Sequence, residues 1–264
     1  MQSSAQALPL LVVETGNTTT GFTVIRERVV VRTSRISTES LALTERPELL
    51  LQPLVAEYPD MPDAVLCSVV PTVSAMLQEV LSQLLQGTVL HISSSLRLPF
   101  VLQYESPEAF GADRIALCAA GRKLFPDRPL IALDVGTAIT VDVLGSTGLY
   151  LGGFIMPGIN LMARSLHDRT AQLPLITVIK PGELLGHSTA ACIRNGIYWG
   201  CIAQIEGLAG RVMRSLREEG EGEPAIIITG GNAPSVLPSL HLPVLLVEHA
   251  VALGAHYLYE LNAP

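Results

Sequence analysis

Lysine is nearly absent from this chain. Only Lys123 and Lys180 occur among 264 residues, charged residues make up 16% of the total, and the formal net charge is −7. A nucleic-acid-binding protein is expected to carry a basic patch, and no cluster of Lys and Arg is present. We therefore expect no nucleic-acid partner. The sparse charge leaves much of the surface neutral, and we expect a second subunit to cover part of it.

The chain also lacks long apolar runs and paired cysteines. No apolar stretch approaches the roughly 18–20 residues that span a bilayer, and Met1–Pro9 has no charged segment typical of a secretion signal. The cysteines Cys67, Cys118, Cys192 and Cys201 form no C-x-x-C pair. We expect buried, reduced thiols rather than disulfides or metal ligands. By elimination, the expected protein is cytoplasmic, has no membrane contact, and begins with a disordered leader of eight residues.

Several catalytic signatures are missing as well. The sequence contains no G-x-x-x-x-G-K-[ST] loop, no protein-kinase signature set and no G-x-S-x-G nucleophile motif. With only two lysines, the charge of a bound phosphate would have to be met by backbone N–H groups, hydroxyls and bound cations. These absences exclude a P-loop kinase.

A repeated pattern is present instead. Leu10–Thr20 and Leu130–Thr140, 120 residues apart, each contain an apolar run, a carboxylate, a glycine two residues later and then hydroxyl-bearing residues. The apolar run predicts a buried strand, and the glycine permits a tight turn. Hydroxyls and backbone N–H groups can receive phosphate oxygens while the carboxylate holds a cation. The repeat predicts two similar half-structures that face one nucleotide.

The order of the predicted elements supports this division. Each half has three strand candidates followed by alternating helices and strands, which indicates α/β domains with mixed sheets. We place the domains at residues 1–115 and 116–264. Strands are expected at 10–13, 21–25, 28–33, 64–70, 89–92, 130–133, 139–144, 149–155, 225–228 and 244–247. Helices are expected at 41–57 with interruptions at its prolines, 72–85 capped by Thr72, 115–124, 160–170, 189–216 and 250–261.

The two glycine loops belong to a set of motifs that appear in a fixed order along the chain. Together they resemble the type III pantothenate kinases, members of the acetate and sugar kinase/Hsp70/actin superfamily, from about Leu10 to about Leu258. The resemblance implies two RNase H-like (actin-like ATPase) domains with mixed sheets flanked by helices, and a nucleotide site in the cleft between them. The matching segments are Glu14–Thr18, Tyr104–Arg114, Asp134–Asp142, Gly152–Gly158, Thr170–Pro174, Ser188-Thr189 and Thr229–Gly231.

The resemblance implies an activity and its cofactors. A family member transfers phosphate from ATP to the primary hydroxyl of pantothenate, the first step toward coenzyme A. It works as a homodimer and requires Mg²⁺ and a monovalent cation, K⁺ or NH₄⁺. The first domain would then hold the first phosphate loop and part of the pantothenate pocket. The second would hold the second phosphate loop, the dimer contacts and nucleotide contacts.

The resemblance also implies roles for individual residues. Asp113 is similar to the general base, and Asp134 to the ligand of the monovalent cation. The pantothenate pocket is expected to comprise Tyr104, Gly111, Ala112, Asp113 and Arg114, with Thr189 from the neighbouring subunit. The ATP-binding positions are expected to be Glu14, Thr15, Gly16, Asn17, Thr18, Thr19, Thr20, Gly21 and Thr137.

Two residues depart from the family pattern, and two others have an ordinary structural interpretation. Glu14 stands where the family has aspartate, which places the carboxylate one methylene further from the backbone, and Ser106 stands where the family usually has asparagine. Asp113 at a helix start is typical of an N-cap with a surface charge. Thr189 is as well suited to cap its helix as to contact a ligand.

Two alternatives to an active pantothenate kinase stay open on sequence. A catalytically silent relative would bind nucleotide or pantothenate and act as a regulatory protein; a large gain in rate on Glu14→Asp would favour it. A kinase of the same superfamily acting on another small substrate is the other alternative. The segment Tyr104–Arg114 argues against it, and a panel of substrates would decide.

Overall fold

The computed structural model describes residues 8–263, so most of the expected leader lies outside the described residues. Internal contacts group the chain into two compact units. The N-terminal unit comprises the chain up to Lys123 together with the segment from Ala250 onward, and the C-terminal unit comprises Leu124–His249. A linear division after residue 115 does not describe this grouping, because the last helix packs on the first sheet.

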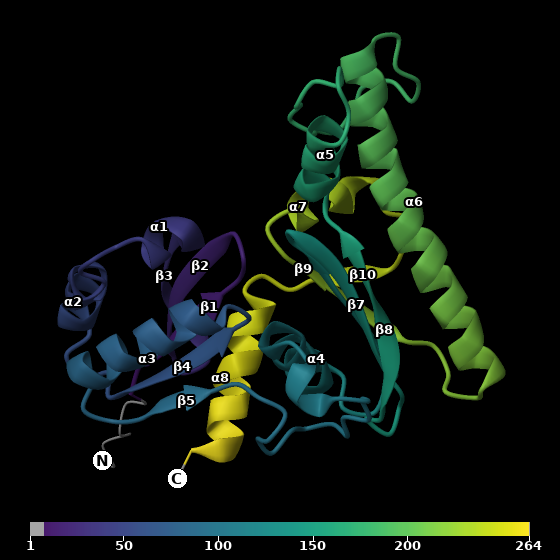
Figure 1. The fold of residues 1–264 in the computed structure, drawn as a ribbon. Coiled ribbons are helices and arrows are strands. Elements are labelled where there is room, and N and C mark those ends of the chain that lie inside the picture. Colours follow the sequence, from purple (N-terminus) through teal and green to yellow (C-terminus); the bar gives the residue numbers. More distant parts are fainter. Residues whose placement is uncertain (1–7, 264) are drawn as a thin grey trace. The chain divides into compact units, whose positions relative to one another are not determined.

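The two units contain sheets of the same topology (Figure 1). The N-terminal sheet has the order β3-β2-β1-β4-β5, with β1 antiparallel to β2 and parallel to β4. The C-terminal sheet has the order β8-β7-β6-β9-β10, with β6 antiparallel to β7 and parallel to β9. The predicted repeat of two half-structures with mixed sheets is therefore confirmed. The strands are β1 (Leu10–Thr15), β2 (Thr19–Arg26), β3 (Val29–Ser37), β4 (Asp63–Ser68), β5 (Val89–His91), β6 (Leu130–Val135), β7 (Ala138–Leu144), β8 (Tyr150–Pro157), β9 (Ala225–Thr229) and β10 (Val244–Leu246).

Helices accompany each sheet. Those of the N-terminal unit are α1 (Thr38–Ala42), α2 (Glu48–Glu57), α3 (Pro71–Leu84), α4 (Ala112–Leu124) and α8 (Ala250–Asn262), with a 3-10 turn at Pro107–Ala109. Those of the C-terminal unit are α5 (Ile159–Asp168), α6 (Thr189–Glu218) and α7 (Ala233–Val236), with a 3-10 turn at Leu237–Ser239.

The central strand β1 of the N-terminal sheet is buried on both faces. Leu11 and Val13 of β1 belong to a hydrophobic cluster with residues of α1, α2 and α3. Leu10 and Val12 are also buried, and since side chains alternate along a strand they point to the opposite face. Helix α8 packs against β1 and β4. The nearly continuous apolar run of β1, which predicted a buried strand, thus reflects helices on both sides.

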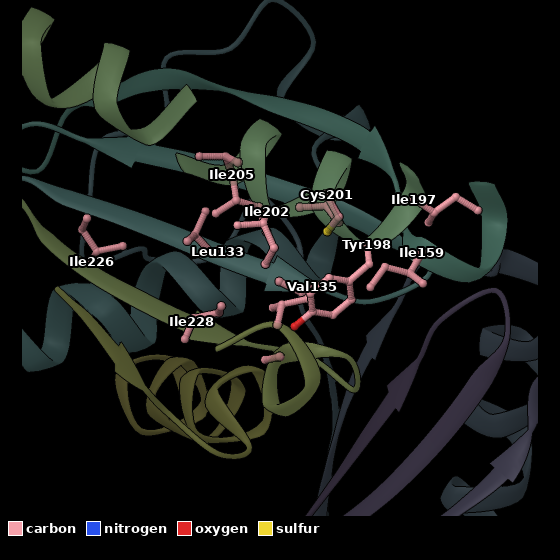
Figure 2. Packing of buried hydrophobic residues seen from close by; sticks show 14 of the residues in the cluster. Leu133, Val135, Ile159, Ile197, Tyr198, Cys201, Ile202, Ile205, Ile226 and Ile228 are labelled. Carbon is pink, nitrogen blue, oxygen red and sulfur yellow. The ribbon is translucent and has the colours of Figure 1, made fainter. Parts of the chain in front are cut away.

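The core of the C-terminal unit lies between its sheet and helices α5, α6 and α7 (Figure 2). Leu133 and Val135 of β6 point toward Tyr198 and Ile202 of α6. Tyr198 is fully buried and its hydroxyl bonds to Ser239 Oγ at 2.8 Å, so its polar end is satisfied inside the core. This packing fixes the direction in which β6 ends, and the end of β6 carries the second glycine loop.

Two local predictions are corrected by the structure, and one helix was not predicted. The segment 41–57 contains the end of α1 and, after the predicted interruption at Pro47, the whole of α2, but Pro53 causes no interruption and is accommodated inside α2. Thr72 does not cap α3: Pro71 occupies the first turn and Val70 is the N-cap, which suits proline because its position needs no N–H donor. The short helix α7 was not expected.

The expectation of buried thiols holds for three of the four cysteines. All four cysteines are free; three are buried, whereas Cys192 is exposed. In the part of the chain that the structure describes, no helix combines the length and apolar character that crossing a bilayer requires.

Candidate phosphate-transfer site

The first glycine loop forms a tight hairpin between β1 and β2. The Gly16 N–H donates to the Thr19 carbonyl at 3.0 Å, which closes the turn. Asn17, Thr18 and Thr19 at its tip are exposed, and Glu14 before the turn is half-buried. The predicted residues Gly16–Thr19 are therefore placed where a ligand can reach them.

Thr15 and Thr20 are placed differently from the loop tip. Thr15 is 2% exposed, and Thr20 has no exposed surface. The Thr20 hydroxyl lies 3.0 Å from the hydroxyl of Thr38, the first residue of α1, and is bound there. A side-chain contact with phosphate is thus sterically unavailable to Thr20 in this conformation.

Gly21 provides space for Glu14, the glutamate that stands where aspartate was expected. It pairs directly with Glu14 across the β1–β2 ladder. A Cβ placed on Gly21 would lie 3.8 Å from Glu14 Oε2, so the carboxylate extends over the surface of Gly21. The longer glutamate is accommodated over a residue that has no side chain of its own.

The second glycine loop joins β6 to β7 and is closed in a similar way, by a hydrogen bond from the glycine N–H. The Gly136 N–H donates to the Ala138 carbonyl at 3.0 Å. From the end of β9, the Asn232 N–H donates to the Val135 carbonyl at 2.9 Å, and the Asn232 side chain donates to the Gly136 carbonyl at 3.2 Å. Thr137 at the turn is exposed. Three carbonyl oxygens around this turn are bonded within the protein, which orients them away from any bound anion.

Asp134 lies near the end of β6, directly before this second loop. It pairs with Thr229 of β9, and the next residue, Gly230, has φ +100°. A Cβ on Gly230 would collide with Asp134 Oδ1 and with the backbone of Val135. The T-G-G motif and the D-x-G-T motif, about 95 residues apart in sequence, are thus in direct contact. Glycine is required because its backbone approaches the carboxylate closely in a left-handed conformation.

Asp113 occupies the first turn of α4 in the N-terminal unit. Its Oδ1 accepts a hydrogen bond from the Arg114 N–H at 2.8 Å. Burial raises the pKa of the Asp113 carboxyl, while this hydrogen bond and the charge of Arg114 oppose the rise. A Cβ on Gly111 would lie 2.5 Å from Asp113 Oδ1, so glycine at that position leaves the carboxylate its place. Asp113 lies inside the helix rather than at a cap position, and its environment is that of a partly desolvated carboxyl group.

Arg114 joins Asp113 to two aromatic rings. The guanidinium carbon lies 4.3 Å from the centroid of the Phe110 ring and 5.9 Å from that of Tyr104. The two rings meet edge to face, with centroids 4.9 Å apart. Arg114 is 8% exposed, whereas Tyr104 is 40% exposed. The structure thus assembles Tyr104, Gly111, Asp113 and Arg114 from one short segment, and Ala112 is buried beneath them.

Thr189 is the first residue of α6 and does not cap it. The Ser188 hydroxyl accepts from the Ala191 N–H at 3.2 Å and is the N-cap. Thr189 is exposed. Its hydroxyl is therefore not used by the helix terminus.

The residues suit a cation that is shared with a ligand rather than one held by the protein alone. Within the described chain, no group of three or more His, Cys, Asp or Glu side chains could hold a metal ion. Mg²⁺ is ordinarily bound by one or two carboxylates, water and substrate phosphates. Asp134, beside the backbone of Gly136 and Gly230, fits that kind of site.

Thr38 and Asn232 are structurally important residues that the sequence did not single out. Thr38 bonds to the first loop and Asn232 to the second. Hydroxyl residues at 37 and 38 before a short helix are a detectable capping signal, and Ser37 does accept from the Ser40 N–H. No local pattern indicates that the neighbouring threonine bonds to a turn 20 residues earlier.

Solved structures of other proteins have a fold similar to that of this chain. The chain has a TM-score of 0.59 to a Sinorhizobium meliloti protein that carries a provisional 2-dehydro-3-deoxygalactonokinase name, at 12% identity and covering 95% of this chain and 98% of that one. The (R)-2-hydroxyglutaryl-CoA dehydratase component A of Acidaminococcus fermentans gives 0.51 at 14% identity, covering 96% and 97%. Two mixed sheets flanked by helices, with a glycine hairpin in each, define the actin-like fold of sugar kinases and related ATPases.

Sequence comparison identifies the family. The model of the type III pantothenate kinases matches residues 10–211. Proteins named type III pantothenate kinase from Chlorobium luteolum and Chlorobaculum parvum are 48% and 43% identical to this chain. The alignments cover 96% and 98% of this chain and 94% and 97% of the two relatives. The chain belongs to the type III pantothenate kinase family.

Proposed function

We propose that this chain transfers the terminal phosphate of ATP to the primary hydroxyl of pantothenate, the first step toward coenzyme A. Membership of the family supports the reaction. The observation that supports a working site is the partly desolvated Asp113 carboxylate, held beside the Tyr104–Phe110–Arg114 cluster. An isolated aspartate on a helix surface would have neither the raised pKa nor the adjoining cluster of two aromatic rings and a guanidinium.

In this proposal Asp113 orients the hydroxyl and accepts its proton. A primary hydroxyl is barely acidic, so the proton moves to the carboxylate late, as the new bond to phosphorus forms. Gly111 leaves room for the carboxylate, and the Arg114 N–H fixes one of its oxygens. The other oxygen, Oδ2, is then the atom proposed to face the substrate.

The pocket beside Asp113 is proposed to hold pantothenate. Tyr104 and Arg114 present an aromatic edge and a planar cation, and the contact between them and Phe110 limits their freedom. Arg114 suits a carboxylate or amide-bearing ligand because its fork of donors is rigid. Thr189 is proposed to complete this pocket from the second subunit of a homodimer.

The phosphates are proposed to bind at the glycine loops. Asn17, Thr18, Thr19 and Thr137 are exposed at the two turns and supply hydroxyl, amide and backbone donors. Such donors replace the lysine that a P-loop kinase would use. Phosphoryl transfer depends mainly on positioning and charge neutralisation, which these loops are suited to provide.

Asp134 is proposed to hold the monovalent cation that the reaction uses. Mg²⁺ and a monovalent cation, when bound, neutralise charge on the phosphates. The protein's part is to keep the Asp134 carboxylate at the end of β6, between Gly136 and Gly230. We further propose that the protein is cytoplasmic, where its substrates would be found.

Replacement of K⁺ by Na⁺ is expected to weaken ATP binding to the wild-type protein. Calorimetry with ATP and Mg²⁺ in matched KCl and NaCl buffers measures the effect. In Asp134→Asn, ATP should bind weakly and equally in the two salts, because the carboxylate that distinguishes them is gone. A wild-type affinity that is the same in both salts would remove the monovalent cation from Asp134.

The activity is tested by measuring ADP release by the purified full-length chain with ATP, Mg²⁺ and K⁺. Release is expected to depend on added pantothenate, and a panel of other small hydroxyl substrates serves as the control. ATP binding without pantothenate-dependent release would contradict the proposed kinase. It would instead favour the silent relative considered from the sequence, for which the comparisons offer no support.

A further inference from the structure

Thr38 bonds to the first phosphate loop through both its side chain and its backbone. This residue begins α1 and is 4% exposed. Its hydroxyl donates to the Gly16 carbonyl at 2.7 Å, and its N–H donates to the Thr18 carbonyl at 3.0 Å. Thr38 thus binds two carbonyl oxygens of the loop that is proposed to receive phosphate.

The hydrogen bond from Thr38 to Gly16 determines which hydroxyl donates in the contact between Thr20 and Thr38. A threonine hydroxyl has a single proton to donate. Since that of Thr38 goes to Gly16, the 3.0 Å contact with Thr20 must be made by the Thr20 proton. The Thr20 hydroxyl therefore donates to the Thr38 hydroxyl, which in turn donates to the Gly16 carbonyl. Both hydrogen bonds require the Thr38 hydroxyl.

Most backbone carbonyls of the first loop are bonded within the protein and are not available as outward-facing acceptors. The Thr15 carbonyl accepts from the Val69 N–H, and the Thr19 carbonyl from the Gly16 N–H. With Gly16 and Thr18 bound to Thr38, four of the five carbonyls from Thr15 to Thr19 are bonded inside the N-terminal unit. Within the described residues the Asn17 N–H has no backbone partner. The loop thereby withdraws most of its acceptors and leaves the Asn17 N–H as a donor for an anion.

We propose that Thr38 is a positioning residue for ATP, which keeps the carbonyls of the first loop turned away from the phosphates. An unheld carbonyl oxygen at the turn would repel a phosphate oxygen at close range. Thr38 itself does not touch the nucleotide. The role rests on the proposed function only in that the loop's anion is taken to be ATP.

Thr38→Val tests this role, because valine keeps the shape and removes the hydroxyl. We expect a rise in the KM for ATP on the order of tenfold, as one buried hydrogen-bond donor is lost and the Gly16 carbonyl is released. The KM for pantothenate should stay unchanged. Thr38→Ser keeps the hydroxyl and should restore wild-type values.

Thr23→Val is the matched control. Thr23 lies on β2, outside the first loop, and is 1% exposed. It should retain the wild-type KM for ATP. A merely structural role for Thr38 would reduce the amount of active protein and lower kcat, with both KM values unchanged, and that result would overturn the proposal.

Direct calorimetry with ATP separates this inference from the proposed activity. If wild-type protein fails to phosphorylate pantothenate while Thr38→Val still weakens ATP binding about tenfold, the activity is contradicted and the role of Thr38 stands. Equal ATP affinity in wild type and Thr38→Val contradicts the role of Thr38, whatever the substrate of the enzyme.

Discussion

Asp113→Asn is expected to lower turnover with pantothenate by about 10²–10⁴-fold, the range associated with loss of a general base. Asparagine has nearly the same shape, and its side-chain oxygen can still accept from the Arg114 N–H, so the fold and ATP binding should be unchanged. Steady-state ADP release measures kcat, calorimetry measures ATP affinity, and urea unfolding measures stability.

Asp127→Asn is the matched control for this variant. Asp127 is an exposed aspartate in the turn after α4 and makes the same chemical change possible outside the site. It should retain wild-type turnover. Turnover of Asp113→Asn within a few-fold of the wild type would remove Asp113 from the role of base.

The pH dependence of kcat/KM follows from the same carboxyl. Burial raises the pKa of Asp113 above the value of about 3.9 that is usual for aspartate. Because a base acts only when deprotonated, a raised pKa moves the acidic fall in kcat/KM to higher pH. The fall should therefore lie above about pH 3.9 and be absent from the residual activity of Asp113→Asn. A fall that persists unchanged in that variant would assign it to another group.

Gly230→Ala is expected to weaken ATP binding and to destabilise the protein. Gly230 has φ +100°, and a Cβ would collide with Asp134 Oδ1 and the backbone of Val135. To avoid this collision, either the loop that follows β9 or the Asp134 carboxylate must move. A strained backbone of this kind costs about 1–3 kcal/mol in the free energy of unfolding, measured by urea denaturation. ATP affinity, measured by calorimetry in KCl, should fall as Asp134 is displaced.

The adjacent glycine supplies the stability control for this prediction. A Cβ on Gly231 would meet nothing within 4 Å. Gly231→Ala should therefore unfold at nearly the same urea concentration as the wild type. If Gly230→Ala and Gly231→Ala were equally stable, the close approach of Gly230 to Asp134 would not constrain the loop as described.

The local sequence was sufficient to predict the repeat, with its buried strands and tight turns. The apolar runs before Glu14 and Asp134 predicted buried strands, and the glycines after them predicted tight turns; both are found, in sheets of one topology. These features are local, because strand periodicity and turn chemistry depend on neighbouring residues. The family resemblance, carried by ordered motifs, is likewise confirmed. The roles of individual site residues stay predictions.

Tertiary structure decided which residues of each motif face outward and which support them. Thr20 matched the predicted phosphate loop as well as Thr19 did, yet only Thr19 is exposed, because Thr20 bonds to Thr38 at the start of α1. Gly230 contacts Asp134 only because β9 pairs with β6. Such contacts join residues distant in sequence. No local pattern encodes them, since they arise when strands pair and bring two chain segments within hydrogen-bonding distance.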